Sequence, residues 1–289
     1  MLAIVGTVPD LDVPVLDAPV VVDGADLVVD GRMISPDRGT AALLAAAVET
    51  ARLLNEPMPH VFLVGDQGVG DGSRALYAHL ATVLPKRQYS TMVFHYLQPD
   101  VDWHNKVLLA IQEMEHPPRL IADAGFMYAA KMSGQAPAYD LFTPDAGELA
   151  FLADETAPHP FYTRGFILHD DNHTPDLIAR AYAHENAAEM LLVKGTVDYV
   201  ADRDGIRYSV AEPVSEPMEA MGGTGDTVTG MVAALIESGL SVDVAAHYAI
   251  KANRLSGFLA QPSPATRVGA LIPFLAEAMR LAGVHVAEI

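Results

Sequence analysis

The sequence predicts an α/β fold in which a mostly parallel sheet is covered by helices on both faces. Short, continuously apolar runs alternate along the chain with longer segments whose apolar residues recur at helical spacing. Strands that are apolar on both faces are typical of parallel sheets with helices on either side. Because the gaps between these segments are short, we expect one domain over residues 1–289, with its core at residues 26–282.

Each element follows from these two patterns. The apolar runs predict strands at residues 20–22, 61–64, 92–94, 120–122, 139–142, 166–168 and 190–193. Helical spacing predicts helices at residues 40–54, 73–84, 105–115, 146–153, 175–186, 225–237, 242–259 and 268–281. Between residues 198 and 210, two β-rich runs flank an Asp-Arg-Asp-Gly turn, which predicts a hairpin. Residues 1–25 are expected to form an N-terminal strand or arm, since their start lacks the basic region of a signal peptide.

The composition argues against several classes of partner. The chain has 18 Lys and Arg against 37 Asp and Glu, a net charge of −19. Such a surface repels nucleic acids and anionic membranes, although a local pocket can still bind a small phosphorylated ligand. There is no cysteine, so disulfides, thiol nucleophiles and Cys-based zinc sites are excluded. No apolar stretch is long enough to cross a membrane, and we expect a cytoplasmic protein.

The most informative motif is the run Met-Gly-Gly-Thr-Gly-Asp-Thr-Val-Thr-Gly at residues 221–230. Gly222, Gly223, Thr224 and Gly225 stand directly before a helix with a single apolar stripe. Glycines let the backbone approach a ligand and point successive N–H groups at one place, where the helix dipole adds positive charge. This pattern predicts an anion site for phosphate.

Asp226 is unexpected beside a bound phosphate, because its carboxylate would repel one. The role that fits is a general base that removes the proton of an alcohol as a phosphoryl group arrives. The alternative is a structural Asp whose charge stabilises the first turn of the helix.

Two other glycine patterns are weaker. The chain has no Gly-x-x-x-x-Gly-Lys-Ser/Thr motif, and Val228 replaces the third glycine of a dinucleotide fingerprint. The loop Gly-Asp-Gln-Gly-Val-Gly at residues 65–70, with Gly68 and Gly70, follows a predicted strand and precedes a helix. It is either a ligand loop or an ordinary tight turn.

Charged residues also follow three predicted strands. Lys194 is positioned either to reach a phosphate or to extend along the sheet edge into solvent. Asp145 and Glu148 either form a capping box or place Glu148 on Mg²⁺, directly or through water. Asp123 is a third carboxylate at a strand end, where open α/β sheets bind their ligands.

These residues resemble a known family, the ADP/ATP-dependent NAD(P)H-hydrate dehydratases of the ribokinase-like superfamily. The run at residues 222–230 is similar to the signature Gly-Gly-Ser/Thr-Gly-Asp-x-Leu-Thr-Gly. Further runs agree in the same order: Gly39-Thr40-Ala41-Ala42-Leu43-Leu44, Gly65-Asp66-Gln67-Gly68-Val69-Gly70, Leu120-Ile121-Ala122-Asp123-Ala124, Thr143-Pro144-Asp145-Ala146-Gly147-Glu148 and Val193-Lys194-Gly195.

The resemblance implies a three-layer α/β/α sandwich and the repair of NADH or NADPH that has been hydrated on the nicotinamide ring. It implies that ADP or ATP phosphorylates the ring hydroxyl, that Asp226 is the base, and that phosphate then leaves. Gly222, Gly223, Thr224 and Gly225 would form the phosphate-binding hole. The nucleotide would contact Lys194, Gly195, Thr196 and Asn253. Substrate or Mg²⁺ would lie near Asp123, Asp145, Glu148, Gly68, Gly70 and Gly39, with Glu148 holding Mg²⁺ indirectly. Family members are often homo-oligomers, and small nucleotides are the expected partners.

The sequence departs from the family pattern at places that matter for function. Asp145-Ala146 replaces a His-Pro pair that is expected near the substrate, and Asp66-Gln67 replaces Pro-Gly in the second glycine loop. In the penultimate helix, Asn253 and Arg254 either contact the nucleotide or form a solvated face. Two alternatives to the dehydratase therefore stay open: a small-molecule kinase that uses the same Asp226, and a nucleotide-binding protein without catalysis.

Overall fold

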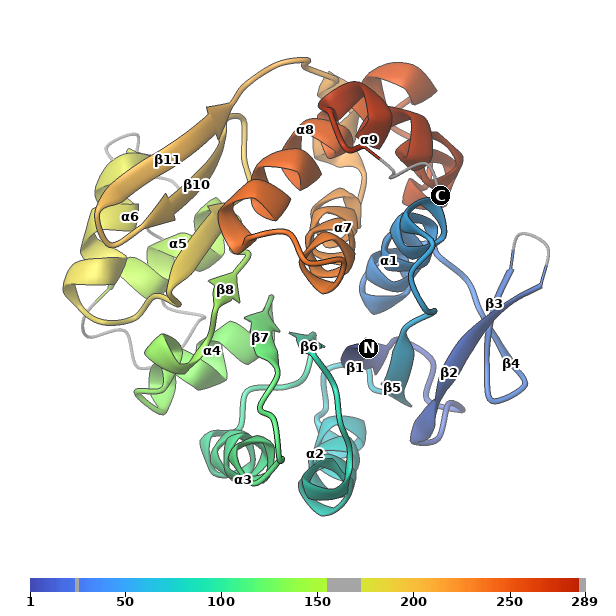
Figure 1. The fold of residues 1–289 in the computed structure, drawn as a ribbon, viewed down its shortest axis with the longest axis vertical. Coiled ribbons are helices and arrows are strands. Elements are labelled where there is room, and N and C mark those ends of the chain that lie inside the picture. The colour runs from blue at the N-terminus through green and yellow to red at the C-terminus, as the bar shows by residue number, and fades with distance from the viewer. Residues whose placement is uncertain (24–25, 155–172, 286–289) are drawn as a thin grey trace.

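The computed structural model describes residues 1–23, 26–154 and 173–285, and within them the chain builds one 11-stranded sheet between two layers of helices (Figure 1). The strand order is β11-β10-β9-β8-β7-β6-β1-β5-β2-β3-β4. The α/β/α architecture with a mostly parallel centre confirms the predicted fold class. None of the helices in these ranges is long and apolar enough to cross a membrane.

The strands are β1 (Leu2–Val8), β2 (Leu16–Asp23), β3 (Asp26–Val29), β4 (Arg32–Ile34), β5 (His60–Gly65), β6 (Thr91–His95), β7 (Arg119–Ala122), β8 (Leu141–Phe142), β9 (Met190–Val193), β10 (Asp198–Asp202) and β11 (Gly205–Val210). The α-helices are α1 (Thr40–Leu54), α2 (Asp71–Val83), α3 (Val101–Gln112), α4 (Gly125–Met132), α5 (Ala146–Ala153), α6 (Thr174–Ala183), α7 (Thr224–Glu237), α8 (Val242–Ala260) and α9 (Leu275–Ala282).

The parallel strands run from β9 through β8, β7, β6 and β1 to β5, and antiparallel strands flank them on both sides. Strand β1 lies at the centre, where Val5 pairs with Phe62 on one side and with Phe94 on the other. All of its residues are buried. Of the two predictions for the N-terminus, the structure therefore shows a strand, and its place inside the sheet explains its apolar sequence.

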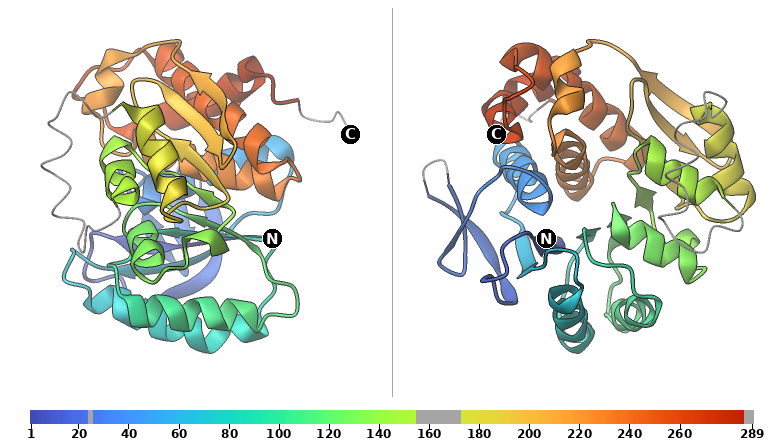
Figure 2. Two further views of the ribbon diagram at one scale, coloured as in Figure 1. Left: turned by 90° about the vertical axis from the view of Figure 1, so that its left-hand side faces the viewer. Right: turned by 180° about the vertical axis from the view of Figure 1, so that it is seen from behind.

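The two faces of the sheet bury separate apolar clusters. Helices α1, α7, α8 and α9 cover one face with small and branched side chains, and α2 to α6 cover the other with more aromatic ones. Figure 2 shows the same layers from the side and from behind, with the orange and red helices opposite the teal and green ones. Because all parallel strands point the same way, their carboxyl ends and the loops after them meet at one edge.

Most predicted elements are confirmed, and the exceptions have local causes. Helix α1 and strand β9 have the predicted bounds, and β10 and β11 form the predicted hairpin. In the expected strand at residues 139–142, only β8 pairs with its neighbours, because a 3-10 turn precedes it. The expected helix at 268–281 divides into a 3-10 helix (Val268–Phe274) and α9, with Pro273 inside the first part. Helix α4 and the pair β3–β4 were not predicted, and the expected strand at 166–168 lies outside the described residues.

Helices α1 and α7 approach each other closely at Gly230. A Cβ atom added there would lie 2.1 Å from the carbonyl oxygen of Leu43 and 3.0 Å from the backbone nitrogen of Ala47. The last glycine of the 222–230 signature is therefore a packing residue, and it brings the first turn of α7 next to the start of α1.

The loop between β5 and α2 folds around the carboxylate of Asp66. One oxygen accepts hydrogen bonds from the backbone N–H groups of Gly68 (2.9 Å), Val69 (3.1 Å) and Gly70 (3.1 Å). The other accepts from the N–H (2.8 Å) and the hydroxyl (2.7 Å) of Ser73. Burial by itself raises the pKa of Asp66, but these donors lower it below its ordinary value. The protein's own carboxylate thus occupies the place where this loop would bind an anion.

Replacing Gly230 with Ala should destabilise the protein by about 1–3 kcal/mol, because the added methyl group forces α1 and α7 apart. Urea unfolding measures the change. Gly222→Ala is the matched control, since a Cβ there meets no atom within 4 Å. Equal stability of the two variants would show that the helices can separate at no cost.

Asp66→Asn should cost about 1–3 kcal/mol at neutral pH, because the amide cannot accept all of these hydrogen bonds. Because the pKa of Asp66 is lowered in the folded protein, its ionised carboxylate stabilises the fold fully above the ordinary carboxyl pKa. This stabilisation is lost as the pH falls through the pKa of Asp66 in the folded protein. The difference between wild type and variant should therefore be constant from about pH 8 to 5 and shrink below about pH 4. Urea unfolding across this range tests it. The control is Asp71→Asn at the start of α2, whose exposed carboxylate forms an ion pair with Arg74; a similar loss in both variants would contradict the account.

Candidate active site

A cavity of about 680 Å³ lies at the carboxyl ends of the parallel strands. Its walls are formed by residues that follow β6, β7, β8 and β9, by the first turn of α7 and by one face of α8. Because these segments are far apart in the sequence, the cavity is a product of the fold and not of one motif. It has the position of a ligand site in an open α/β sheet.

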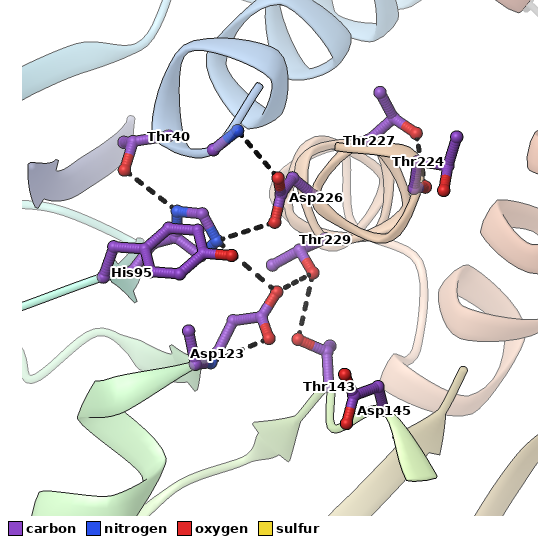
Figure 3. Close-up of polar contacts among 12 residues, drawn as sticks. Thr40, His95, Asp123, Thr143, Asp145, Thr224, Asp226, Thr227 and Thr229 are labelled. Carbon is purple, nitrogen blue, oxygen red and sulfur yellow. Dashed lines mark hydrogen bonds and ion pairs between the residues drawn. The ribbon is translucent and has the colours of Figure 1, made fainter. Parts of the chain in front are cut away.

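Asp226 lies in the first turn of α7, lines this cavity and is 8% exposed. Each of its carboxylate oxygens has a donor (Figure 3): the N–H of Gly39 at 2.8 Å and Nε2 of His95 at 3.0 Å. Burial by itself raises the pKa of Asp226, but the hydrogen bond from His95 and the charge of Lys194 lower it below its ordinary value. The carboxylate is therefore held ionised in a fixed orientation.

His95 is the functional candidate that the sequence analysis missed. It ends β6, is fully buried, and places its Nδ1 atom 2.9 Å from the hydroxyl oxygen of Thr40. The two ring nitrogens thus connect the start of α1 to the carboxylate of Asp226 (Figure 3). The sequence offered one signal for His95, its place as a polar residue at the carboxyl end of an apolar strand. Its partner Asp226 lies 131 positions away, so the sequence did not connect the two residues.

Asp123, just beyond β7, forms a buried ion pair with Lys194 beyond β9. The ammonium group lies 3.1 Å from both carboxylate oxygens, and the hydroxyl of Thr229 donates to one of them at 2.6 Å. Burial by itself lowers the pKa of Lys194, but the surrounding carboxylates, Asp123 first among them, raise it above its ordinary value. Lys194 is therefore a fixed positive charge in the cavity and does not extend along the sheet edge into solvent.

By distance alone, His95, Asp123 and Asp226 could hold a metal ion. Nε2 of His95 is 3.8 Å from the Asp123 carboxylate and 3.0 Å from that of Asp226. The ammonium group of Lys194 already supplies a cation to Asp123, and His95 already supplies a donor to Asp226. Protein groups therefore already pair with both carboxylates of this cluster, and we do not assign a metal to it.

The first turn of α7 offers unused donors to the cavity. Within the described residues, the backbone N–H groups of Gly223, Thr224, Gly225 and Asp226 have no acceptor, and the helix has no side-chain cap. Gly223 has a φ of 101°, and a Cβ there would lie 2.8 Å from a methyl group of Val268. These free N–H groups and the helix dipole are suited to bind an anion, and the anion hole that the sequence predicts at this place stays a prediction. Gly222 is exposed and does not line the cavity.

Asp145 and Glu148 form the capping box that the sequence left as one alternative. The Asp145 carboxylate accepts from the N–H of Glu148 at 2.8 Å, and the Glu148 carboxylate accepts from the N–H of Asp145 at 2.9 Å. Both residues also line the cavity. Burial and the charges of Asp123 and Asp145 raise the pKa of Glu148 above its ordinary value. Unshared oxygens on these carboxylates fit Mg²⁺, which takes one or two carboxylates together with substrate phosphates.

Arg254 on α8 holds the loop after Lys194 in place. Its guanidinium donates to Asp198 at 2.6 Å and to the carbonyl oxygens of Gly195 (3.0 Å) and Thr196 (2.8 Å). Asp198 in turn accepts from the N–H of Gly195 at 2.9 Å. The interpretation of this helix face as solvated is therefore wrong for Arg254, whose side chain is 11% exposed.

The structure brings most of the predicted site residues together. The cavity is lined by Asp123, Asp145, Glu148, Lys194, Gly195, Thr196, Gly223, Thr224, Gly225, Asp226 and Asn253. The carbonyl oxygen of the Asn253 side chain accepts from the Thr227 hydroxyl at 2.8 Å. Gly39 is not in the lining but contacts Asp226 through its N–H. The N–H groups of Gly68 and Gly70 bind Asp66 in the β5–α2 loop, and the structure does not bring these two glycines to the cavity.

Comparison with known proteins supports this architecture. In curated sequences, the uncharacterized protein MJ1337 of Methanocaldococcus jannaschii is 37% identical over 238 residues, which cover 82% of this chain and 98% of MJ1337. Among solved structures, a ribokinase-like superfamily protein from Enterococcus faecalis has a TM-score of 0.58 and 13% identity over 97% of this chain and 87% of its own. The pyridoxal kinase from Staphylococcus aureus, in complex with AMP-PCP and pyridoxal, has a TM-score of 0.53 and 13% identity over 88% and 86%.

The ADP/ATP-dependent NAD(P)H-hydrate dehydratase from Bacillus subtilis, co-crystallized with ATP and Mg²⁺, has a TM-score of 0.57 and 17% identity over 97% of this chain and 89% of its own. At these identities the structural likeness shows the ribokinase-like fold. The Carb_kinase family model, described as NAD(P)H-hydrate dehydratase, matches residues 97–271, more than half of the chain. The chain therefore belongs to the NAD(P)H-hydrate dehydratase family.

Proposed function

We propose that this protein dehydrates hydrated NADH or NADPH at the expense of ATP or ADP. The observation that carries the proposal is the position of Asp226, an ionised carboxylate held by two donors beside free N–H groups in the same cavity. A base next to an anion hole is the arrangement needed to phosphorylate an alcohol.

In the first step, Asp226 accepts the proton of the ring hydroxyl while that oxygen forms a bond to the terminal phosphorus and the bond to the nucleotide diphosphate or monophosphate breaks. The N–H groups of Gly223, Thr224 and Gly225 hold the oxygens of the transferred group. Lys194 contributes positive charge next to these groups, since a Cβ at Gly225 would lie 3.5 Å from its ammonium nitrogen. Mg²⁺, when bound near Glu148 and Asp145, would neutralise phosphate charge.

In the second step, the carbon–oxygen bond breaks and phosphate leaves with the bonding electrons. The neighbouring carbon loses a proton, and the ring double bond returns. The sum is hydrated NAD(P)H plus ATP giving NAD(P)H, ADP, phosphate and a proton. The structure supports the first step through Asp226 and the anion hole, and the family match supports the second.

A small-molecule kinase is the second candidate, because the pyridoxal kinase from Staphylococcus aureus has the same fold. The same base and anion hole would serve it, and the product would be a stable phosphoester. A protein that binds nucleotide without turnover is the third.

The test is to mix the protein with hydrated NADH or NADPH, Mg²⁺ and either ATP or ADP, and to follow the return of the NADH absorbance. We expect NAD(P)H and inorganic phosphate in equal amounts. A phosphorylated organic product without release of phosphate would favour the kinase, and nucleotide binding without any product would favour the silent protein.

Asp226→Asn should lower turnover by about 10²-fold or more while nucleotide binding is retained, because the base is lost and the anion hole is kept. Steady-state kinetics and nucleotide titration measure the two effects. Asp243→Asn is the control, since Asp243 lies in the first turn of α8 and outside the cavity lining. If both variants keep full turnover, Asp226 only stabilises its helix.

His95→Phe should lower turnover at least about 10-fold and move the acidic limb of the kcat/KM profile to higher pH. The reason is that His95 lowers the pKa of Asp226, so the base is protonated more readily without it. His95→Gln, which can keep one N–H donor, should recover part of the loss. His104→Gln serves as control, because His104 is equally buried and bonds Tyr139 outside the cavity. An unchanged acidic limb in His95→Phe would rule out this positioning role.

A further inference from the structure

Tyr96 is an aromatic residue of the cavity wall that has no role in the reaction as described so far. It follows His95 directly at the end of β6, lines the cavity and is 47% exposed. Its ring meets that of His95 edge-on, with the centroids 4.3 Å apart. His95 in turn binds the carboxylate of Asp226, so the tyrosine ring contacts the residue that holds the proposed base.

The backbone of Tyr96 is in an unfavourable conformation. Its φ is 54°, in the left-handed region that bulky residues rarely adopt. The hydroxyl of Thr7 donates to its carbonyl oxygen at 2.9 Å and fixes this conformation. Residues held in strained conformations cluster at ligand sites, where the surrounding structure imposes them to direct a side chain. Ala124, with a φ of 53°, shares this feature in the wall of the same cavity.

The ring of Tyr96 is partly covered and partly open to the cavity. His95 contacts it at an interplanar angle of 67°, and a Cβ at Gly39 would be 3.6 Å from its Cε2 atom. The remaining 47% exposure and the place of Tyr96 in the cavity wall leave part of the ring for a ligand. Partial burial, and then the charges of Asp226, Asp123 and Glu148, raise the pKa of the Tyr96 hydroxyl, so it stays protonated and neutral. A neutral, half-exposed aromatic ring beside carboxyl groups suits contact with an uncharged ring better than contact with a second anion.

We propose that Tyr96 is a specificity-determining residue that packs its ring against the nitrogen-containing ring of the substrate and presents the hydroxyl of that ring to Asp226. The proposal rests on the proposed function for the identity of the ring, a reduced nicotinamide. The same chemistry would recognise the pyridine ring of an alcohol substrate if the protein were a kinase. Tyr96 thus selects the ring, while the first turn of α7 and Lys194 select the phosphates.

The test measures equilibrium binding by titration calorimetry. NADH and, separately, pyridoxine are titrated into the wild type, Tyr96→Leu and Tyr96→Phe. Tyr96→Leu should weaken binding of the ring compound about 10-fold, and Tyr96→Phe should keep most of the affinity, because the face of the ring makes the contact. The affinity for ATP should be the same in all three proteins. Phe258→Leu is the control, since Phe258 is 58% exposed on α8 and outside the cavity lining.

The outcomes separate this proposal from the proposed function. Tyr96-dependent binding of NADH supports it whether or not the dehydration assay gives product, and Tyr96-dependent binding of pyridoxine alone supports the stacking role while moving the substrate to a pyridine alcohol. The stacking role is wrong if Tyr96→Leu binds both ring compounds as tightly as the wild type does. It is also wrong if the wild type binds neither compound, or if the affinity of Tyr96→Leu for ATP falls together with its affinity for the ring compound. An equal loss in Tyr96→Phe would assign the contact to the hydroxyl and also overturn it. Thermal unfolding of each variant shows that it is folded.

Discussion

The carboxylate of Asp226, held between the N–H of Gly39 and the ring of His95, is the interaction on which the rest of the site depends. Its donors come from the start of α1 and the end of β6, so it requires three elements to meet at one point. The close contact of α1 and α7 at Gly230 makes this possible, because any larger side chain there would separate the two helices. A packing glycine within the α1–α7 interface therefore determines where the proposed base stands.

The electrostatics of the cavity resolve a conflict that the composition creates. A protein of net charge −19 that places Asp123, Glu148 and Asp226 in one cavity should repel a nucleotide. Two features oppose this repulsion locally: the raised pKa of Lys194 keeps its positive charge, and the N–H groups at the start of α7 have no acceptor of their own. The second glycine-rich loop shows the contrast, since Asp66 already satisfies its N–H groups. Of the two glycine loops, only the one before α7 is open to an anion.

The sequence was sufficient for features that depend on neighbours along the chain. The apolar runs located the parallel strands other than β1, which was left as a strand or an arm, and the capping box of Asp145 and Glu148 needs only residues three apart. His95 could not be assigned, because its role exists only through Asp226, 131 positions away. The solvated face that was one alternative for Arg254 is wrong for the same reason: its partners, in the loop after Lys194 and at Asp198, lie 56 to 59 positions earlier. Pattern reasoning finds a site when one segment carries it and fails when distant segments share it.

The placement of the imidazole also bears on the departure from the family pattern at Asp145-Ala146. In the family that this run resembles, a histidine at that place is expected near the substrate. Here Asp145 caps α5 instead, and the imidazole near the base belongs to His95, which is fully buried and approaches Asp226 from inside the protein. A buried imidazole cannot contact a substrate in the cavity, so its effect must pass through the carboxylate it holds. The wall that remains free for the reacting ring then includes Tyr96, which stands on the cavity side of the same strand end. His95 and Tyr96 are adjacent in sequence but have different roles in this proposal. His95 orients the carboxylate of Asp226 from the buried side, and Tyr96 faces the cavity in which the ligand would bind.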